Sequence, residues 1–298
     1  MATAPTYGAC TVKRARRTKD QIGQIDRQIL DVLNEDHPQS VRHVFYRMTD
    51  PRLPQPVEKS DRGYRHVQRR IVEMRRVGRL ACGWITDATR RGYFTPTFTS
   101  AADFIRSFKG QYRADLWQHS DYYCEVWTES RSIAGVVQAD CEELAVSLYP
   151  AGGFTSLSLP FQGAEYINEV YAGREVVIFY IGDYDPAGVL IDVSIERELR
   201  EHLDGDVELI FKRIGITAEQ VREHNLPRKP RKEGDRRALH ITYTVEAEAM
   251  PARTMRALLR GHVEALLPPR ALEVSRAAEE SERALLDGVA GMLWRASP

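Results

Sequence analysis

Residues 175–188, EVVIFYIGDYDPAG, place two aspartates directly after a long apolar run. A continuous apolar run bounded by turn residues is typical of a buried strand, and Pro186 and Gly188 fit a sharp turn into a following helix. Asp183 and Asp185 would then stand together at the end of the strand. Like charges ~4 Å apart repel by roughly 4 kcal/mol at an effective dielectric of ~20. Solvent, a partner cation or a metal ion must offset that repulsion, unless the two aspartates simply cap the helix in solvent.

The sequence on both sides of this stretch alternates between strand and helix patterns. Strand-like runs occupy 122–129, 152–159, 175–182 and 206–214, with helical patterns at 130–149, 160–172 and 185–203. Such alternation predicts an α/β domain with a parallel four-stranded sheet covered by helices. A basic, proline-rich segment at 226–237 and a short strand within 238–250 follow, and helices are expected from there to a helical C-terminus.

The first 120 residues have a different pattern. Residues 1–20 carry a basic arm that we expect to be disordered, and apolar residues at helical spacing predict helices within 21–33, 41–50 and 61–80. Ser40 is placed to cap the second helix. A hairpin is expected at 81–98, and a linking helix at 101–117. Three helices and a hairpin are the order of a winged helix, so we predict a winged-helix domain at 21–120 and the α/β domain at 121–298.

The net charge of zero is divided unequally along the chain. Residues 1–100 hold 19 Lys/Arg and 10 Asp/Glu, a net of +9, whereas residues 101–298 hold 23 and 32, a net of −9. A basic front half favours a polyanion as partner. The arginines near the third predicted helix are either an ordinary solvated surface or a DNA-binding face, and the candidates are Arg47, Arg62, Arg65, Arg69, Arg70, Arg75 and Arg76.

Composition excludes several protein classes. No stretch approaches the ~18 consecutive apolar residues of a membrane helix, and the N-terminus lacks the apolar segment of a secretory signal. We therefore expect no membrane association and a cytoplasmic, nucleoid-associated protein. The four cysteines are widely spaced, which indicates neither a disulfide framework nor a zinc site.

Three carboxylates stand at strand ends, where parallel α/β sheets collect their ligands. Glu129 closes the run at 122–129, and Asp183 and Asp185 close the run at 175–182. Carboxylate oxygens suit a hard divalent cation, so we predict a Mg²⁺ site here, with Mn²⁺ as a substitute.

This constellation resembles a Toprim domain, and the segment GDYDPAG is similar to the Toprim motif of the topoisomerase VI A subunit and of the related meiotic double-strand-break transesterase. The resemblance covers roughly residues 20–265 and is nearest to compact "mini-A" proteins of mobile elements. Downstream, VEAEAM places Glu248 where the family has an Asp. The other residues that match the family pattern are Thr217, Gln220, Leu226, Pro227, Pro230, Lys232, Asp235 and Arg236.

The same family carries its nucleophile in a winged-helix (5Y-CAP-like) domain, within a motif read as R-D-I-Y-Y. RHVFY at 42–46 resembles it, with Tyr46 at the attacking position, Arg42 at the arginine and His43 in place of the acidic residue. A tyrosine, with a pKa of about 10, needs nearby cations to act as a nucleophile at neutral pH. Tyr46 could equally be a buried aromatic residue of the helix.

The resemblance implies a homodimeric, Mg²⁺-dependent topoisomerase-like transesterase. Tyr46 of one protomer would work with the carboxylates of the other and leave 5′-phosphotyrosyl ends on double-stranded DNA. The sequence has no G-x-x-x-x-G-K-[ST] motif, so ATP-driven strand passage would need a separate ATPase B subunit. Two alternatives stay open: a Toprim nuclease that uses metal-activated water with a structural Tyr46, and a non-catalytic DNA-binding module.

Overall fold

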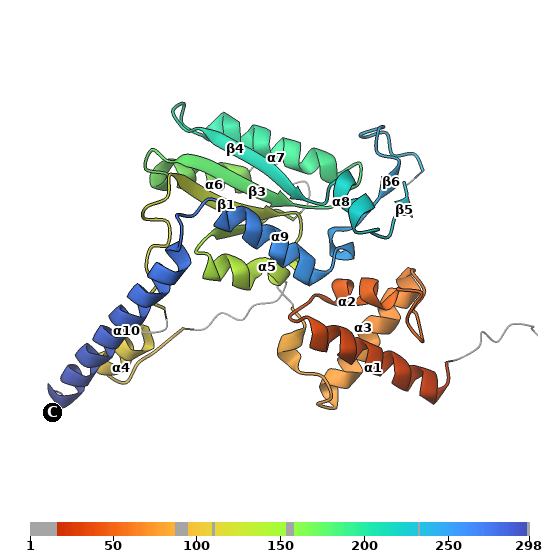
Figure 1. Ribbon diagram of the computed structural model, residues 1–298, viewed down its shortest axis with the longest axis horizontal. Helices are drawn as coiled ribbons and strands as arrows, with labels where there is room; N and C mark the ends of the chain where they lie inside the picture. The colour runs from red at the N-terminus through yellow and green to blue at the C-terminus, as the bar shows by residue number, and fades with distance from the viewer. Residues whose placement is uncertain (1–16, 87–94, 109–110, 153–157, 232, 297–298) are drawn as a thin grey trace, which may run out of the picture.

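The computed structural model of the chain describes residues 17–86, 95–108, 111–152, 158–231 and 233–296. Its centre is a parallel sheet in the order β2-β1-β3-β4 (Figure 1). The strands are β1 (Tyr122–Thr128), β2 (Ser147–Pro150), β3 (Glu175–Ile181) and β4 (Leu209–Gly215). The predicted α/β class and the parallel four-stranded sheet are therefore confirmed.

Helices cover both faces of the sheet because the apolar residues of β3 alternate between them. Val176, Ile178 and Tyr180 belong to a core with α6 (Ser158–Val170) and α7 (Gly188–His202). Val177 and Phe179 face the opposite way, toward α5 (Arg131–Glu143) and α9 (Ala252–Glu264). Figure 1 shows the two layers on either side of the sheet. A sheet buried on both faces explains why β3 reads as an unbroken apolar run.

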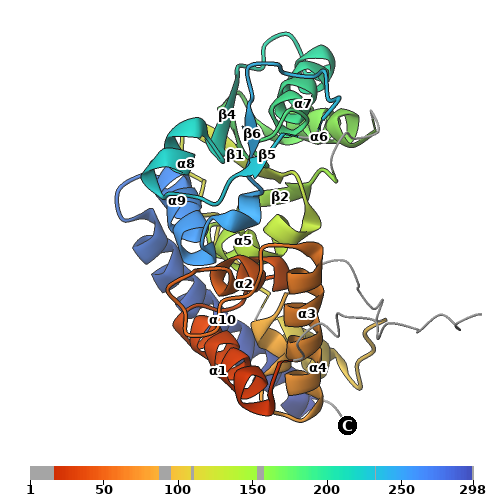
Figure 2. The same cartoon turned by 90° about the vertical axis from the view of Figure 1, so that its right-hand side faces the viewer.

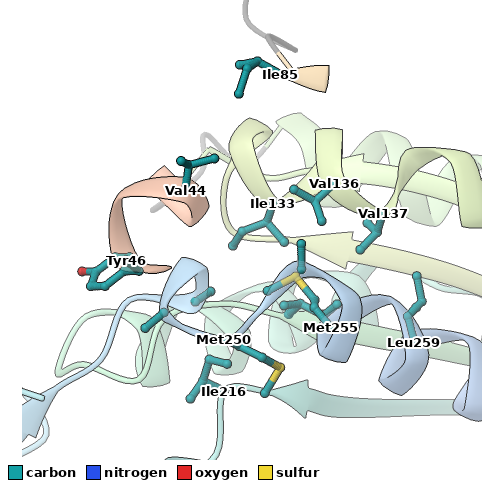
Figure 3. Close-up of a cluster of buried hydrophobic side chains, with 14 of the residues drawn as sticks. Val44, Tyr46, Ile85, Ile133, Val136, Val137, Ile216, Met250, Met255 and Leu259 are labelled. Carbon is teal, nitrogen blue, oxygen red and sulfur yellow. The ribbon is translucent and has the colours of Figure 1, made fainter. Parts of the chain in front are cut away.

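The N-terminal part contains three helices, α1 (Lys19–Glu35), α2 (Val41–Met48) and α3 (Asp61–Arg76). Ser40 caps α2 by accepting a hydrogen bond from the His43 amide, as the sequence predicts. The three helices bury one shared core, which is continuous with that of α5 and α9, and Figure 3 shows part of it. The expected hairpin at 81–98 is not confirmed, since 87–94 lie outside the described residues and 82–84 form a short 3₁₀ helix, η1 (Cys82–Trp84).

The prediction for the second strand is wrong in position. We expected a helix through 149 and a strand at 152–159, whereas α5 ends at Glu143 and β2 occupies Ser147–Pro150. Ala145 has a left-handed φ of 51°, which ends the helix without the glycine that normally signals such a stop. Residues 153–157 lie outside the described part, and so do residues 1–16 of the expected basic arm.

Short elements and long helices complete the chain. β5 (Lys229–Pro230) pairs antiparallel with β6 (Tyr243–Thr244), near α8 (Ala218–Glu223) and the 3₁₀ helix η2 (Ala247–Ala249). α10 (Ala271–Ala296) packs along α4 (Ala101–Phe108) and projects from the body (Figure 1). The expected linking helix at 101–117 is therefore limited to α4 in the described residues, and the helical C-terminus is confirmed. None of the described helices is both long and apolar enough to span a bilayer.

Candidate functional site

The predicted acidic residues lie where the order of the strands reverses. β1 and β3 are neighbours, and the chain leaves β1 toward β2 on one side and β3 toward β4 on the other. At such a switch point the two following loops separate and leave a crevice beyond the carboxyl ends of the strands. Glu129 follows β1, and Asp183 and Asp185 follow β3, so the fold brings all three residues to this crevice.

A hydrogen bond links the two strand ends. Glu129 Oε2 accepts from the amide of Asp183 at 2.7 Å, and the Glu129 amide donates to the carbonyl of Ile181 at 2.9 Å. Gly182 makes this approach possible, since a Cβ there would lie 2.7 Å from Glu129 Oε2 and 2.7 Å from Tyr180 Oη. The first glycine of GDYDPAG is therefore required by the close contact between the two loops.

The second glycine of the motif and Asp185 shape the start of α7. Asp185 Oδ1 accepts from the amides of Ala187 and Gly188 at 2.8 and 2.6 Å, so it does cap the helix. A Cβ on Gly188 would lie 2.3 Å from the carbonyl oxygen of Asp183. Asp185 Oδ1 therefore holds the start of the helix through these hydrogen bonds. Asp185 Oδ2 is the oxygen that could bind a cation.

Asp183 connects the acidic loop to the segment that precedes α9. Its Oδ1 accepts from the amide of Ala247 at 2.8 Å, and Tyr184 and Val245 exchange two backbone hydrogen bonds of 2.9 Å. Glu248, the residue at the family's Asp position, is 7% exposed at this junction. The carboxylates of Glu129, Asp183, Asp185 and Glu248 therefore lie at one edge of the sheet, close enough for their charges to affect one another.

Burial and mutual repulsion perturb these acids. Desolvation raises the pKa of Glu129, and the charges of Asp185 and Glu248 raise it further. Desolvation and then the charge of Glu129 raise the pKa of Asp183 well above its ordinary value. A cation in the crevice would oppose both effects, because it favours the charged form of each carboxyl group.

The donor chemistry fits a hard divalent cation. Glu129, Asp183 and Asp185 each use one oxygen for backbone amides, and the second oxygen accepts no hydrogen bond within the described residues. In the described part of the chain, however, no three His, Cys, Asp or Glu side chains already converge as a metal-binding group. The acids are gathered at one crevice, and a coordination shell would require their free oxygens to turn toward a common point.

Two residues beside the acids, the partly buried Arg213 and the buried Tyr180, were not predicted from the sequence. Arg213 on β4 donates to the carbonyls of Gly182, Asp183 and Gly188 at 3.1, 3.2 and 2.7 Å, and it pairs with Asp192 at 2.5 Å. Tyr180 is fully buried, and its hydroxyl has no hydrogen-bond partner in the described structure. The one available signal for Arg213 was a pair of basic residues, Lys212 and Arg213, within a strand whose other side chains are apolar.

Tyr46 lies on α2, 7% exposed, at the margin of the core shared by the helices and the sheet. Figure 3 shows its hydroxyl oxygen directed away from that core. Burial raises its pKa, and the charge of Glu246 raises it further, so the phenol is protonated in this state. No hydrogen bond or ion pair joins Tyr46 to Glu129, Asp183 or Asp185 within the described residues of the chain.

Arg42 lies one helical turn before Tyr46 and binds the segment that carries η2. Its Nη1 is 2.5 Å from Glu246 Oε2, and the next residue, Ala247, donates to Asp183. Figures 1 and 2 both show η2 next to α2. The helix that carries the candidate nucleophile is therefore joined to Asp183 through two consecutive residues, Glu246 and Ala247.

His43, which replaces the acidic residue of the family motif, is part of the core. It is 1% exposed, its Nδ1 is 2.9 Å from Ser40 Oγ, and burial together with the charge of Arg256 lowers its pKa to about 3. The imidazole is therefore neutral at physiological pH, and it cannot supply the negative charge of the residue that it replaces.

The candidate DNA-binding arginines divide into exposed and engaged residues. Arg70 makes two 2.7 Å hydrogen bonds to the buried carboxylate of Asp26, and we therefore reinterpret it as a structural link between α1 and α3. Arg47 pairs with Glu35 at 2.5 Å, and Arg75 donates to the carbonyl of Cys82. The candidate arginines that are exposed on α3 are Arg62, Arg65, Arg69 and Arg76.

Several of the residues between 217 and 236 that match the family pattern have structural roles. Thr217 and Gln220 form a capping box at the start of α8, and Pro230 lies in β5. Asp235 pairs with Arg237 at 2.9 Å, whereas Lys232 lies outside the described residues.

Comparison with protein-family models, with curated proteins and with solved structures finds no match to this chain.

Proposed function

We propose that the chain is a Mg²⁺-dependent, DNA-cleaving transesterase related to the topoisomerase VI A subunit, and that it acts as a homodimer. In this proposal, the sheet domain is a Toprim domain and α1–α3 form the helical part of a winged helix. The observation that carries the proposal is the hydrogen bond from the Asp183 amide to Glu129 Oε2, which unites the two acidic strand ends at the switch point.

The chemistry assigned to Tyr46 is an exchange of phosphoester bonds. Its phenolic oxygen forms a bond to phosphorus, the bond from phosphorus to the 3′ oxygen breaks, and the proton lost by the phenol is balanced by the one gained by the 3′ hydroxyl. The exchange conserves the phosphoester and permits resealing. Arg42 opposes the rise that burial and Glu246 cause in the pKa of the phenol, and Lys59 and Lys229 add positive charge near the ring. Such positive charge would stabilise the phosphoryl transition state.

Glu129, Asp183 and Asp185 would hold the Mg²⁺, which supplies Lewis-acid stabilisation of phosphate oxygens when bound. Asp185 would also keep the start of α7 in place through its caps. Within one chain, Tyr46 makes no direct contact with these acids in the described residues. That separation is compatible with the arrangement implied by the family, in which the tyrosine of one protomer works at the acids of its partner.

A Toprim nuclease is the second candidate, and the buried state of Tyr46 favours it. A tyrosine that is 7% exposed and protonated is well suited to a structural role. Hydrolysis needs only the acidic site and a water molecule. Both candidates use duplex DNA, so DNA binding alone does not separate them. A separate ATPase subunit would be needed only for ATP-driven strand passage by the transesterase.

Supercoiled DNA with Mg²⁺ or Mn²⁺ tests the two candidates with two variants. Glu129→Gln should abolish cleavage under either proposal, because it removes a carboxylate of the metal site. Tyr46→Phe should abolish cleavage by a transesterase and leave a nuclease active. Unchanged cleavage by Glu129→Gln would contradict both proposals, and thermal unfolding of each variant controls for misfolding.

A further inference from the structure

A cavity of about 300 Å³ lies next to the candidate nucleophile and is not part of the acidic crevice. Its lining residues come from α2, the loop before α3, the start of α3, β5 and the residue before η2. The residues that line it are Arg42, Phe45, Lys59, Ser60, Asp61, Tyr64, Lys229 and Glu246.

Three cations converge on this cavity from three separate parts of the chain. Arg42 comes from α2, Lys59 from the loop before α3, and Lys229 from β5. The ammonium groups of Lys59 and Lys229 lie 5.7 and 5.9 Å from the centre of the Tyr46 ring. Burial lowers the pKa of Lys59, and the charge of Lys229 lowers it further. An anion is needed to hold these groups together.

Glu246 is that anion in the free protein. Its Oε2 lies 2.5 Å from Arg42 Nη1, and its Oε1 lies 2.5 Å from Lys229 Nζ. Each oxygen of this carboxylate thus accepts a hydrogen bond from a different cationic side chain. Lys59 Nζ donates to the carbonyl of Arg228 at 3.3 Å, which leaves its other two protons available in the described structure.

A phosphodiester has the same recognition chemistry as this carboxylate. It carries one negative charge, and its two non-bridging oxygens accept charge-assisted hydrogen bonds from arginine and lysine. Exchanging the Glu246 carboxylate for a phosphodiester therefore leaves the charge of the cavity unchanged.

We propose that this cavity binds one backbone phosphate of DNA beside Tyr46, and that the Glu246 carboxylate occupies the place of that phosphate until DNA displaces it. The inference rests on the proposed function in taking DNA as the substrate. It adds Lys59, Lys229 and Glu246 to the substrate site, and it assigns Glu246 a competing, autoinhibitory role.

The opposing explanation is that Glu246 is a structural clamp between α2 and the sheet domain. Asp61 provides the matched control because it also lines the cavity, yet it forms no ion pair with Arg42 or Lys229 in the described residues. If only the general electrostatic field matters, Glu246→Gln and Asp61→Asn should tighten DNA binding equally. If Glu246 occupies the place of a phosphate, Glu246→Gln should tighten binding more than Asp61→Asn does.

The test is fluorescence anisotropy with a short blunt-ended duplex in EDTA, so that cleavage plays no part. Lys229→Met and Lys59→Met should each weaken binding roughly 5- to 10-fold, and each should reduce the slope of log K against log salt by about 0.9. Glu246→Gln should tighten binding roughly 5- to 10-fold, which is about 1 kcal/mol, and Asp61→Asn should tighten it by less. Arg197→Met, on the exposed face of α7, should bind as the unaltered protein does.

The binding measurements distinguish failure of the phosphate site from failure of the proposed DNA-cleaving function. If Lys59→Met and Lys229→Met bind like Arg197→Met, or if Glu246→Gln binds no tighter than Asp61→Asn, the phosphate site is refuted while DNA binding stands. If the unaltered chain shows no salt-dependent affinity for the duplex, both fail. Thermal unfolding of each variant confirms the fold, and Lys229 is well suited because its side chain is 42% exposed.

Discussion

Replacing Glu125 with glutamine should make the stability of this protein less sensitive to pH. Glu125 lies in the middle of β1, fully buried, with no cation paired to it in the described structure. Tyr123 Oη donates to its Oε1 at 2.9 Å and Trp127 Nε1 donates to its Oε2 at 2.8 Å. Burial raises its pKa from 4.5 to about 7, although these hydrogen bonds partly oppose the rise.

The size and sign of the effect follow from proton linkage. Between the two pKa values, the folded protein holds a proton that the unfolded chain releases, so the free energy of unfolding falls as the pH rises from 4.5 to about 7. The loss is complete above pH 7 and amounts to about 3 kcal/mol. Glutamine reproduces the protonated carboxyl group, since its amide can donate to Tyr123 and accept from Trp127.

Urea denaturation of the unaltered protein and of Glu125→Gln, at about pH 5 and pH 8, measures this difference directly. The variant should be more stable by about 3 kcal/mol at the higher pH and nearly equal at the lower one. Comparing the two proteins at each pH cancels the contribution of the other acidic residues. Equal differences at both pH values, or a less stable variant at the higher pH, would refute the assignment of a raised pKa to Glu125.

Two further predictions concern the site and the helical domain. Gly182→Ala should weaken Mg²⁺ binding, measured by calorimetry, by roughly tenfold because its Cβ would displace a site carboxylate, whereas Gly261→Ala, where a Cβ meets nothing within 4 Å, should have no effect. Arg70→Met should reduce the free energy of unfolding by about 3 kcal/mol because it leaves the buried carboxylate of Asp26 without its main partner. The exposed Arg69→Met should cost less than about 0.5 kcal/mol, and equal losses would contradict the distinction.

The sequence predicts the parts of the fold whose signals are local. β3 is an unbroken apolar run, and the three N-terminal helices have regular apolar spacing, so their positions follow from periodicity. β2 has four residues of intermediate exposure, and α5 stops before it at a left-handed Ala145 rather than at a glycine. A four-residue strand without apolar alternation, and without a glycine between it and the preceding helix, gave no local signal, and this is why its position was misjudged.

The edge of the sheet at which the acidic residues lie was predictable, and the tyrosine pocket was not. Residues that follow parallel strands meet at one edge of the sheet, but the contact between Glu129 and the Asp183 amide also requires β1 and β3 to be neighbours, which the sequence did not determine. Lys229 and Glu246 meet through β5 and β6, which have two residues each, and through contact with α2. Such contacts depend on the packing of the whole molecule and leave no periodic trace in the sequence.

The covalent capture of Tyr46 on DNA is the most direct test of the proposed transesterase. Supercoiled DNA would be incubated with the protein and Mg²⁺ or Mn²⁺, quenched with denaturant, digested with protease and mapped by peptide mass. If Tyr46 is the nucleophile, a DNA adduct forms on the peptide that contains Tyr46, attached through the 5′ phosphate, and it is absent from Tyr46→Phe. Cleavage without an adduct, retained in full by Tyr46→Phe, would contradict it.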